Sequence, residues 1–122
     1  MAESRQARLL WVDLEMTGLD PARDKIIEVG VIATDFDFHQ VADYQASVKV
    51  SPELMRRRMV GKFWEEHDTT RQALMERSSS TEALPTGQVE NRLVDFIKQY
   101  FVPGQPVYLA GNSIHQDRKF IE

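Results

Sequence analysis

The first half of the chain alternates between apolar runs and short polar connections. Residues 9–12 form a continuous apolar run (Leu-Leu-Trp-Val), which predicts a buried central strand that is covered on both faces. The following Thr-Gly pair ends this strand. Residues 25–36 are rich in Ile and Val, residues 41–50 alternate loosely, and the short polar stretch 37–40 between them predicts a hairpin. The pattern therefore predicts three successive strands.

A helical region is expected after these strands. Ser51 is a favoured N-cap and Pro52 suits the first helical position, so together they predict a helix start. The charge-rich segment that follows is expected to be helical as far as residues 78–87, whose Ser, Pro and Gly content predicts a loop. This loop is not a domain boundary, because neither flank is large enough to fold alone.

The last third of the chain predicts a helix, a short strand and a further helix. The apolar side chains that fall on one face of the first helix are Val89, Leu93, Phe96, Ile97 and Tyr100. A Pro-Gly pair ends that helix, and residues 107–110 predict a short buried strand. Ser113 and Gln116 have the spacing of a capping box, so the final helix is expected to carry Asp117 in its first turns.

Composition limits the classes of function. With 122 residues, 42% of them hydrophobic, residues 1–122 are expected to form a single domain. The absence of cysteine leaves oxygen and imidazole as metal ligands and suits an intracellular protein, cytoplasmic or mitochondrial. No stretch has the length of a membrane span. The net charge of −4 argues against binding long nucleic acid, but permits a short anionic substrate bridged by metal ions.

Two carboxylates at the end of the first apolar run are the first candidate for chemistry. Asp13 and Glu15 are two residues apart, so on a strand they point to the same face, about 6.5 Å apart along it. Such neighbours repel unless a cation lies between them, and Mg²⁺ and Mn²⁺ prefer oxygen ligands. Asp117 is the candidate third ligand, since it follows a short apolar strand. The alternative is that all three acids are ordinary solvated side chains.

Two stretches resemble the motifs of a known family. Residues 13–21 (DLEMTGLDP), followed by Ile-Ile-Glu at 26–28, resemble the first motif of DEDD-type 3′-to-5′ exonucleases, and most closely that of oligoribonucleases. Residues 111–120 (GNSIHQDRKF) resemble their second motif. The similarity extends from about residue 9 to residue 122 and is weakest between residues 51 and 86.

This resemblance implies a fold, a reaction and a set of ligands. The fold would be α/β of the RNase H-like type, a mixed sheet with flanking helices. Asp13, Glu15 and Asp117 would bind two Mg²⁺ or Mn²⁺ ions, and the enzyme would release nucleoside 5′-monophosphates from the 3′ end of short single-stranded RNA. The likeness also suggests a homodimer and no association with membranes.

The resemblance also implies residues that bind the substrate. Leu19 would wedge between the last two bases, and Asn112, Ser113 and Gln116 would lie near the backbone of a bound dinucleotide. An aromatic residue and a histidine from the middle helices would stack on a base and hold the terminal phosphate. Trp64 and His67 are the nearest matches, although Trp64 could equally be a core residue, as large aromatics usually are.

The third motif of the family, which supplies a histidine general base and a fourth aspartate, is absent before the sequence ends. We therefore expect a domain that is incomplete at its C-terminus, with impaired catalysis, because loss of a general base typically costs about 10²- to 10⁴-fold. Two alternatives remain open. The chain could bind metal and oligonucleotides without cleaving them, or Asp13 could be the nucleophile of a haloacid-dehalogenase-type phosphatase, whose D-x-D-x-T motif is similar to residues 13–17.

Overall fold

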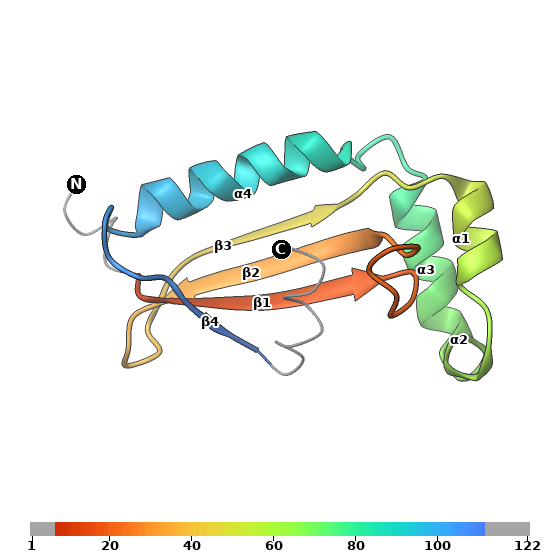
Figure 1. Ribbon diagram of the computed structural model, residues 1–122, viewed down its shortest axis with the longest axis horizontal. Coiled ribbons are helices and arrows are strands. Elements are labelled where there is room, and N and C mark those ends of the chain that lie inside the picture. The colour runs from red at the N-terminus through yellow and green to blue at the C-terminus, as the bar shows by residue number, and fades with distance from the viewer. Residues whose placement is uncertain (1–6, 112–122) are drawn as a thin grey trace.

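One mixed sheet organises residues 7–111, the part of the chain that this computed structural model describes (Figure 1). Its strands lie in the order β3-β2-β1-β4. The strands β1 (Leu9–Met16), β2 (Ile26–Thr34) and β3 (Gln40–Ser47) pair antiparallel, whereas β4 (Tyr108–Ala110) pairs parallel to β1. The three strands predicted for the first half of the chain are thus confirmed, and β1 lies inside the sheet between β2 and β4.

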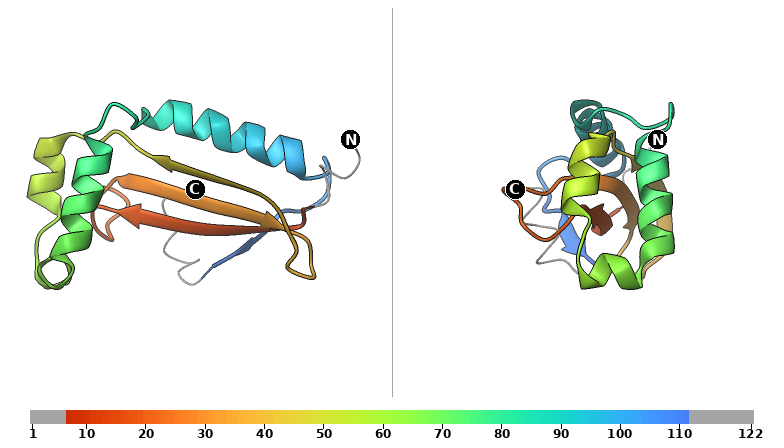
Figure 2. Two further views of the ribbon diagram at one scale, coloured as in Figure 1. Left: turned by 180° about the vertical axis from the view of Figure 1, so that it is seen from behind. Right: turned by 90° about the vertical axis from the view of Figure 1, so that its right-hand side faces the viewer.

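The helices fall into two groups. The longest helix, α4 (Thr86–Tyr100), runs along the sheet, and three short helices gather at the end of the sheet where β1 finishes (Figures 1 and 2). These three are α1 (Pro52–Arg58), α2 (Lys62–Glu66) and α3 (Asp68–Ser78). Ser51 caps α1 as predicted, since its hydroxyl accepts a hydrogen bond from the amide of Leu54.

The larger hydrophobic core lies between α4 and one face of the sheet. Leu10, Val12 and Leu14 alternate along β1 and are buried on this face. From α4, Val89 and Phe96 are buried against them, and Leu93, Ile97 and Tyr100 pack at the margin. The helical face predicted from the spacing of apolar residues is therefore the face that packs on the sheet.

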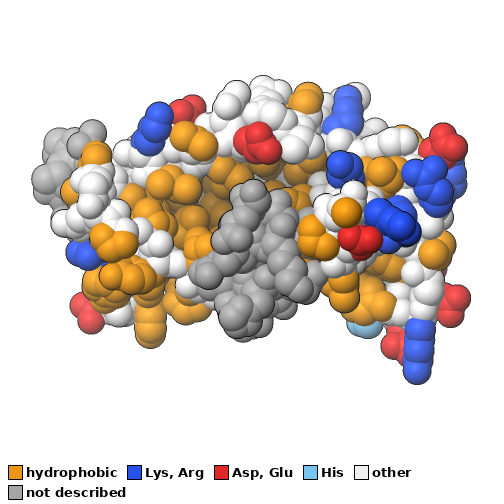
Figure 3. All heavy atoms as spheres, in the orientation of Figure 1, with side chains coloured by type: hydrophobic (Ala, Val, Ile, Leu, Met, Phe, Trp, Pro, Cys, Tyr) orange, Lys and Arg blue, Asp and Glu red, His pale blue; other side chains and the backbone are white. Residues whose placement is uncertain are grey.

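A second, smaller core holds the three short helices on the end of the sheet. Its buried members, which come from β2, the three helices and the segments that follow β3 and α1, are Ile27, Val50, Met55, Met59, Trp64 and Leu74. Figure 3 shows Lys and Arg side chains gathered with acidic ones over this end of the molecule. The three helices thus form a separately packed cap beside the end of β1.

β1 ends at Met16, directly before the Thr-Gly pair that was predicted to end it, because antiparallel pairing with β2 carries the strand through the polar residues that follow the apolar run. Two other features differ from the predictions. The middle helical region is broken at Gly61, whose φ of 104° no helix residue adopts. The strand predicted at residues 107–110 is not buried: Tyr108 is 48% exposed, since β4 is the outermost strand in the described part of the sheet. Among the described residues, no helix combines the length and apolar character that crossing a membrane requires.

Candidate active site

The carboxylates of Asp13 and Glu15 lie on the face of β1 opposite the α4 core, as their spacing predicts. Asp13 is exposed and Glu15 is half-buried, whereas the residues between and around them point into the core. Asp13 lies across from Gly30 of β2, which has no side chain to cover it. The sheet therefore leaves the Asp13 carboxylate open on the side of β2.

A third acid on the same face was missed by the sequence analysis. Glu28 of β2 pairs directly with Glu15, and side chains of such a pair lie on one face with Cβ atoms about 5 Å apart. Arg77 of α3 holds Glu28 in place, with 2.8 Å between Nε of Arg77 and Oε2 of Glu28. The place of Glu28 in the first motif could have identified it as a candidate from the sequence. Only the pairing register of β1 and β2 shows that it lies opposite Glu15.

A cavity of about 590 Å³ adjoins Glu15. One wall is the turn after β1, which includes Leu19, and the other is the segment from the end of α1 to α2, with Val60 and Phe63. These three side chains are 71%, 61% and 59% exposed, respectively, which is unusual for such large apolar groups. An apolar rim next to a carboxylate suits a ligand with both flat apolar and charged parts.

Trp64 and Phe63 have different positions at this cavity. Trp64 is only 5% exposed and belongs to the smaller core, and its indole Nε1 donates a hydrogen bond of 3.0 Å to the carbonyl of Thr17. Phe63, beside it, presents its ring to the cavity rim. Trp64 thus packs as the core alternative describes, and Phe63 is the exposed aromatic of this segment.

His67 lies behind Phe63 and is not among the residues that line the cavity. Its ring stacks on that of Phe63, with centroids 4.4 Å apart and planes 24° from parallel. Its Nδ1 lies 2.8 Å from the carbonyl oxygen of Phe63. The structure therefore brings Leu19, Trp64 and Glu15 to one cavity. His67 lies outside the lining of this cavity and packs against the ring of Phe63.

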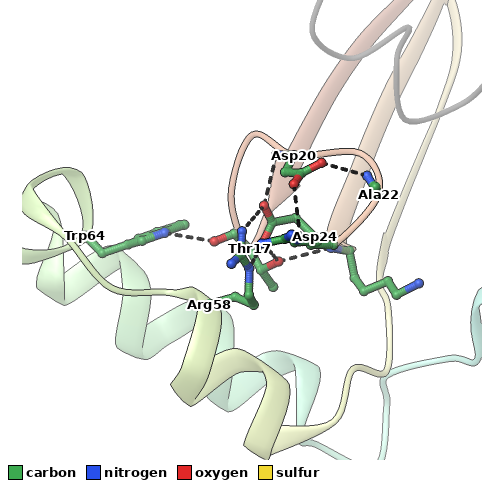
Figure 4. A network of polar contacts seen from close by, with 8 residues as sticks. Thr17, Asp20, Ala22, Asp24, Arg58 and Trp64 are labelled. Carbon is green, nitrogen blue, oxygen red and sulfur yellow. Dashed lines mark hydrogen bonds and ion pairs between the residues drawn. The ribbon is translucent and has the colours of Figure 1, made fainter.

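A buried polar network underlies the turn that carries Leu19 (Figure 4). The Asp24 carboxylate accepts two hydrogen bonds from Arg58 of α1, at 2.9 and 3.1 Å, and one of 2.8 Å from the hydroxyl of Thr17. The Arg58 guanidinium holds the pKa of Asp24 below its ordinary value, and burial acts in the opposite direction. Asp24 is therefore a charged group fixed in the cavity wall, where Asp24 and Arg58 both belong to the lining.

The remaining predicted site residues, Asn112, Ser113, Gln116 and Asp117, lie outside the described residues. The described chain does reach Gly111, directly after β4. Gly111 has a φ of 146°, and a Cβ there would stand 2.6 Å from the carbonyl oxygen of Val12. Only glycine allows so close an approach. The first residue of the second motif therefore lies against β1 next to Asp13.

A different group of potential ligands lies in the β2–β3 hairpin. Within residues 7–111, the one set of three acid or histidine side chains with ligand atoms within 4.8 Å of one another is Asp35, Asp37 and His39. Both carboxylate oxygens of Asp35 already accept hydrogen bonds within the hairpin. This group is separate from the cavity and from Glu15.

Comparison with solved structures defines the class of fold. A product-bound structure of exonuclease I matches 95% of this chain and 24% of its own, with a TM-score of 0.61 and 18% identity. Exonuclease I from Methylocaldum szegediense matches 92% of this chain and 22% of its own, with a TM-score of 0.56 and 21% identity. The described strands and helices therefore form the RNase H-like mixed α/β fold that was predicted.

Sequence comparison then defines the family. The family model described as Exonuclease, RNase_T, matches residues 10–122, and the chain belongs to this family of metal-dependent nucleases. A protein named oligoribonuclease from Neisseria meningitidis serogroup B is 40% identical over 117 residues, 93% of this chain and 58% of its own. The oligoribonuclease of Bordetella pertussis is 35% identical over 118 residues, 97% of this chain and 63% of its own.

These comparisons decide between several of the predictions. The resemblance to oligoribonucleases is confirmed, and the chain spans about three fifths of the length of these relatives. The phosphatase alternative is not favoured, and the antiparallel pairing of β1 with β2 differs from the parallel sheet in which a nucleophile at a strand end is usually found. The relatives are bacterial proteins, which gives the mitochondrial alternative no support.

Proposed function

We propose that this chain carries the metal-binding and base-binding parts of a 3′-to-5′ exoribonuclease that acts on short RNA. The observation that carries the proposal is the position of Asp13 and Glu15, on one open sheet face beside a cavity with an apolar rim. Membership of the exonuclease family and the names of the bacterial relatives support it. Residues 1–122 are proposed as a single exonuclease domain.

Asp13, Glu15 and Asp117 are the proposed ligands of two Mg²⁺ or Mn²⁺ ions. Carboxylates on one face, without a basic residue paired to Asp13 among the described ion pairs, suit hard divalent cations. Glu28, across from Glu15, adds negative charge to the same place. Bound ions would supply Lewis-acid stabilisation of phosphate charge and an activated water.

The proposed reaction is hydrolysis of the last phosphodiester bond. A water oxygen forms a bond to phosphorus, the bond from phosphorus to the 3′-oxygen of the preceding nucleotide breaks, and that oxygen takes up a proton. The products are a nucleoside 5′-monophosphate and an RNA shorter by one nucleotide.

The cavity beside Glu15 is the proposed site for the terminal bases. Leu19 is an exposed residue of one wall, where it can separate two bases, and Phe63 on the other wall offers a ring face for stacking. The structure supports Phe63 in this role better than Trp64, whose ring is buried; His67 would act by holding the Phe63 ring. Asn112, Ser113 and Gln116 are proposed to contact the RNA backbone, and the chain is proposed to act as a homodimer.

The test is incubation of the purified chain with 5′-labelled RNA of two to five nucleotides and Mn²⁺ or Mg²⁺. Products shortened stepwise from the 3′ end are expected, and EDTA and Asp13→Ala should abolish them. Asp43→Ala is the matched control, because Asp43 is an exposed aspartate on the same sheet face, reached through the pairing of β3 with β2. A DNA oligonucleotide of the same length tests the preference for RNA.

Two results would contradict the proposal. Cleavage that survives Asp13→Ala would place the chemistry elsewhere or in a contaminant. Binding of the oligonucleotide without any product, at protein concentrations well above that of the substrate, would favour the alternative of a chain that binds metal and RNA but does not cleave.

A further inference from the structure

An ion pair ties the turn after β1 to the end of α1. Arg58 donates to both carboxylate oxygens of Asp24, which is the geometry of a bidentate pair. The Asp24 side chain is 0% exposed and that of Arg58 is 31% exposed. Because 34 positions separate the two residues, this pair joins segments that the local backbone would leave independent.

The Asp24 carboxylate also sets the shape of the turn itself. It accepts hydrogen bonds from the hydroxyl of Thr17 and, at 3.0 Å, from the amide of Asp20. Gly18 passes so close that a Cβ there would lie 2.4 Å from Oδ2 of Asp24. The backbone is therefore fixed on both sides of Leu19, even though the Leu19 side chain projects into solvent.

The other wall of the cavity begins at Arg58, which itself belongs to the lining, as does Asp24. Val60 and Phe63 follow Arg58 in the chain, and both line the cavity that Leu19 faces. The indole of Trp64 adds a second tether, since it donates to the carbonyl of Thr17. The separation between Leu19 and Phe63 therefore depends on how firmly the turn is held to α1 and α2.

We propose that Asp24 and Arg58 are positioning residues for the substrate, which hold Leu19 and Phe63 at the separation that admits the terminal bases beside Glu15. This inference rests on the proposed function, because the width of the cavity matters only if the cavity binds the terminal bases. Although Arg58 lines the cavity, its guanidinium donates to both oxygens of Asp24, so its role in this proposal is to hold the turn. Loss of either partner should weaken substrate binding while the carboxylates on β1 remain in place.

The kinetic test compares Asp24→Asn, Arg58→Met and the double variant on a 5′-labelled RNA dinucleotide with Mn²⁺. Each is expected to raise KM about 10-fold and to change kcat by less than about 2-fold, because binding before the chemical step is what is lost. The double variant should match the single ones, since both remove the same tether. Arg58→Lys, which keeps the charge, should recover part of the loss. Arg57→Met, at the exposed neighbouring position, is the control.

A structural readout accompanies the kinetics. In ¹⁵N-labelled protein, the indole N–H of Trp64 reports on its bond to Thr17, and that of Trp11, which donates to Thr34 at the other end of the sheet, is the internal reference. The variants should shift the Trp64 signal and speed its hydrogen exchange, and should leave the Trp11 signal unchanged. Folded variants are recognised by that unchanged reference.

The outcomes separate this inference from the proposed function. If Arg58→Met raises KM and Asp24→Asn does not, Arg58 contacts the substrate directly and the inference is overturned. A fall in kcat at constant KM would overturn it as well. If the unmodified chain neither binds nor cleaves the dinucleotide, the proposed function fails. The Trp64 signal then still decides the tether: a shift supports it, and an unchanged signal contradicts it.

Discussion

Two turns of this protein are each held by hydrogen bonds to one aspartate, but the two aspartates connect different parts of the molecule. Asp24 organises the turn between β1 and β2, and Asp35 organises the turn between β2 and β3. Both carboxylates accept hydrogen bonds that hold their pKa below the ordinary value: Arg58 is the largest cause for Asp24, and the amide of His39 is the largest for Asp35. The partners of Asp35, however, all lie within four residues of it.

The difference lies in what each carboxylate connects. Asp24 is buried and its charge is compensated by an arginine from another element, so it joins the cavity wall to the helices at that end. Asp35 only closes its own hairpin, at the surface. Its cluster with Asp37 and His39 has the spacing of metal ligands, but the oxygens of Asp35 are used by the turn. Proximity of several acidic side chains therefore says less about the role of an aspartate here than the secondary-structure elements that the aspartate connects.

Replacing the two aspartates gives the largest expected contrast. Asp24→Asn should lower the free energy of unfolding by about 2 kcal/mol, because the bidentate bond to Arg58 is lost and the amide NH₂ group faces other donors. Asp35→Asn should have a clearly smaller effect, since water can replace the lost bonds. Urea unfolding of both variants at pH 7, followed by circular dichroism, measures the difference. Equal losses of stability would show that Asp24, like Asp35, stabilises only its own turn.

An exposed phenylalanine near each turn allows the two regions to be compared by their effect on dinucleotide binding. Phe63→Ala should weaken dinucleotide binding about 10-fold, since stacking on one base contributes roughly 1 to 3 kcal/mol. Phe38→Ala, in the β2–β3 turn, should leave binding unchanged, although Phe38 is as exposed, at 66% against 59%. Titration of a labelled dinucleotide measures both. A similar loss in both variants would mean that the cavity beside Glu15 is not the base-binding site.

The two tryptophans provide a smaller contrast of the same kind. Trp64→Phe removes the buried bond to Thr17 and should cost about 1 kcal/mol of stability, because the carbonyl is left without a donor in the core. Trp11→Phe removes the bond to the hydroxyl of Thr34, which still donates to the carbonyl of Asp35, so a lesser cost is expected. Thermal unfolding of each variant against the unmodified chain measures this, and a larger loss for Trp11→Phe would reverse the order.

The sequence predicted well what depends on local pattern. Three strands, the cap at Ser51 and the apolar face of α4 follow from periodicity and capping, which are encoded within a few residues. The common face of Asp13 and Glu15 follows from the alternation of a strand, once the strand is known to extend that far. The break of the helical region at Gly61 was missed, because one glycine does not by itself end a helical pattern.

What the sequence did not show depends on contacts between distant segments. Nothing in the spacing of Asp24 and Arg58 indicates that they pair, because the arginine is one of three in a row on α1 and the sequence does not distinguish it from its neighbours. Likewise, Phe63 and Trp64 are neighbours in sequence, and only packing decides which of the two is buried. The assignment of Asp13, Glu15 and Asp117 as metal ligands stays a prediction.

Acid titration gives the smallest expected effect and tests the Asp24 turn without disturbing its packing. The pKa of Asp24 is lower in the folded chain than the ordinary 3.8, so unfolding takes up a proton in acid. The contribution of Asp24 to stability is therefore fully present above about pH 5 and is lost as the pH falls through 3.8 toward the folded value. Between pH 5 and pH 3, the unmodified chain should lose more stability than Asp24→Asn, which has no carboxyl at this position to titrate.

Asp35→Asn is the reference, because Asp35 also has a lowered pKa but is not buried, so its removal should flatten the pH dependence less. Urea midpoints at intervals of about half a pH unit measure the slopes. Parallel slopes for Asp24→Asn and the unmodified chain would mean that the charge on Asp24 contributes nothing to the tether, and that the hydrogen bonds of Thr17 and Trp64 hold the turn alone.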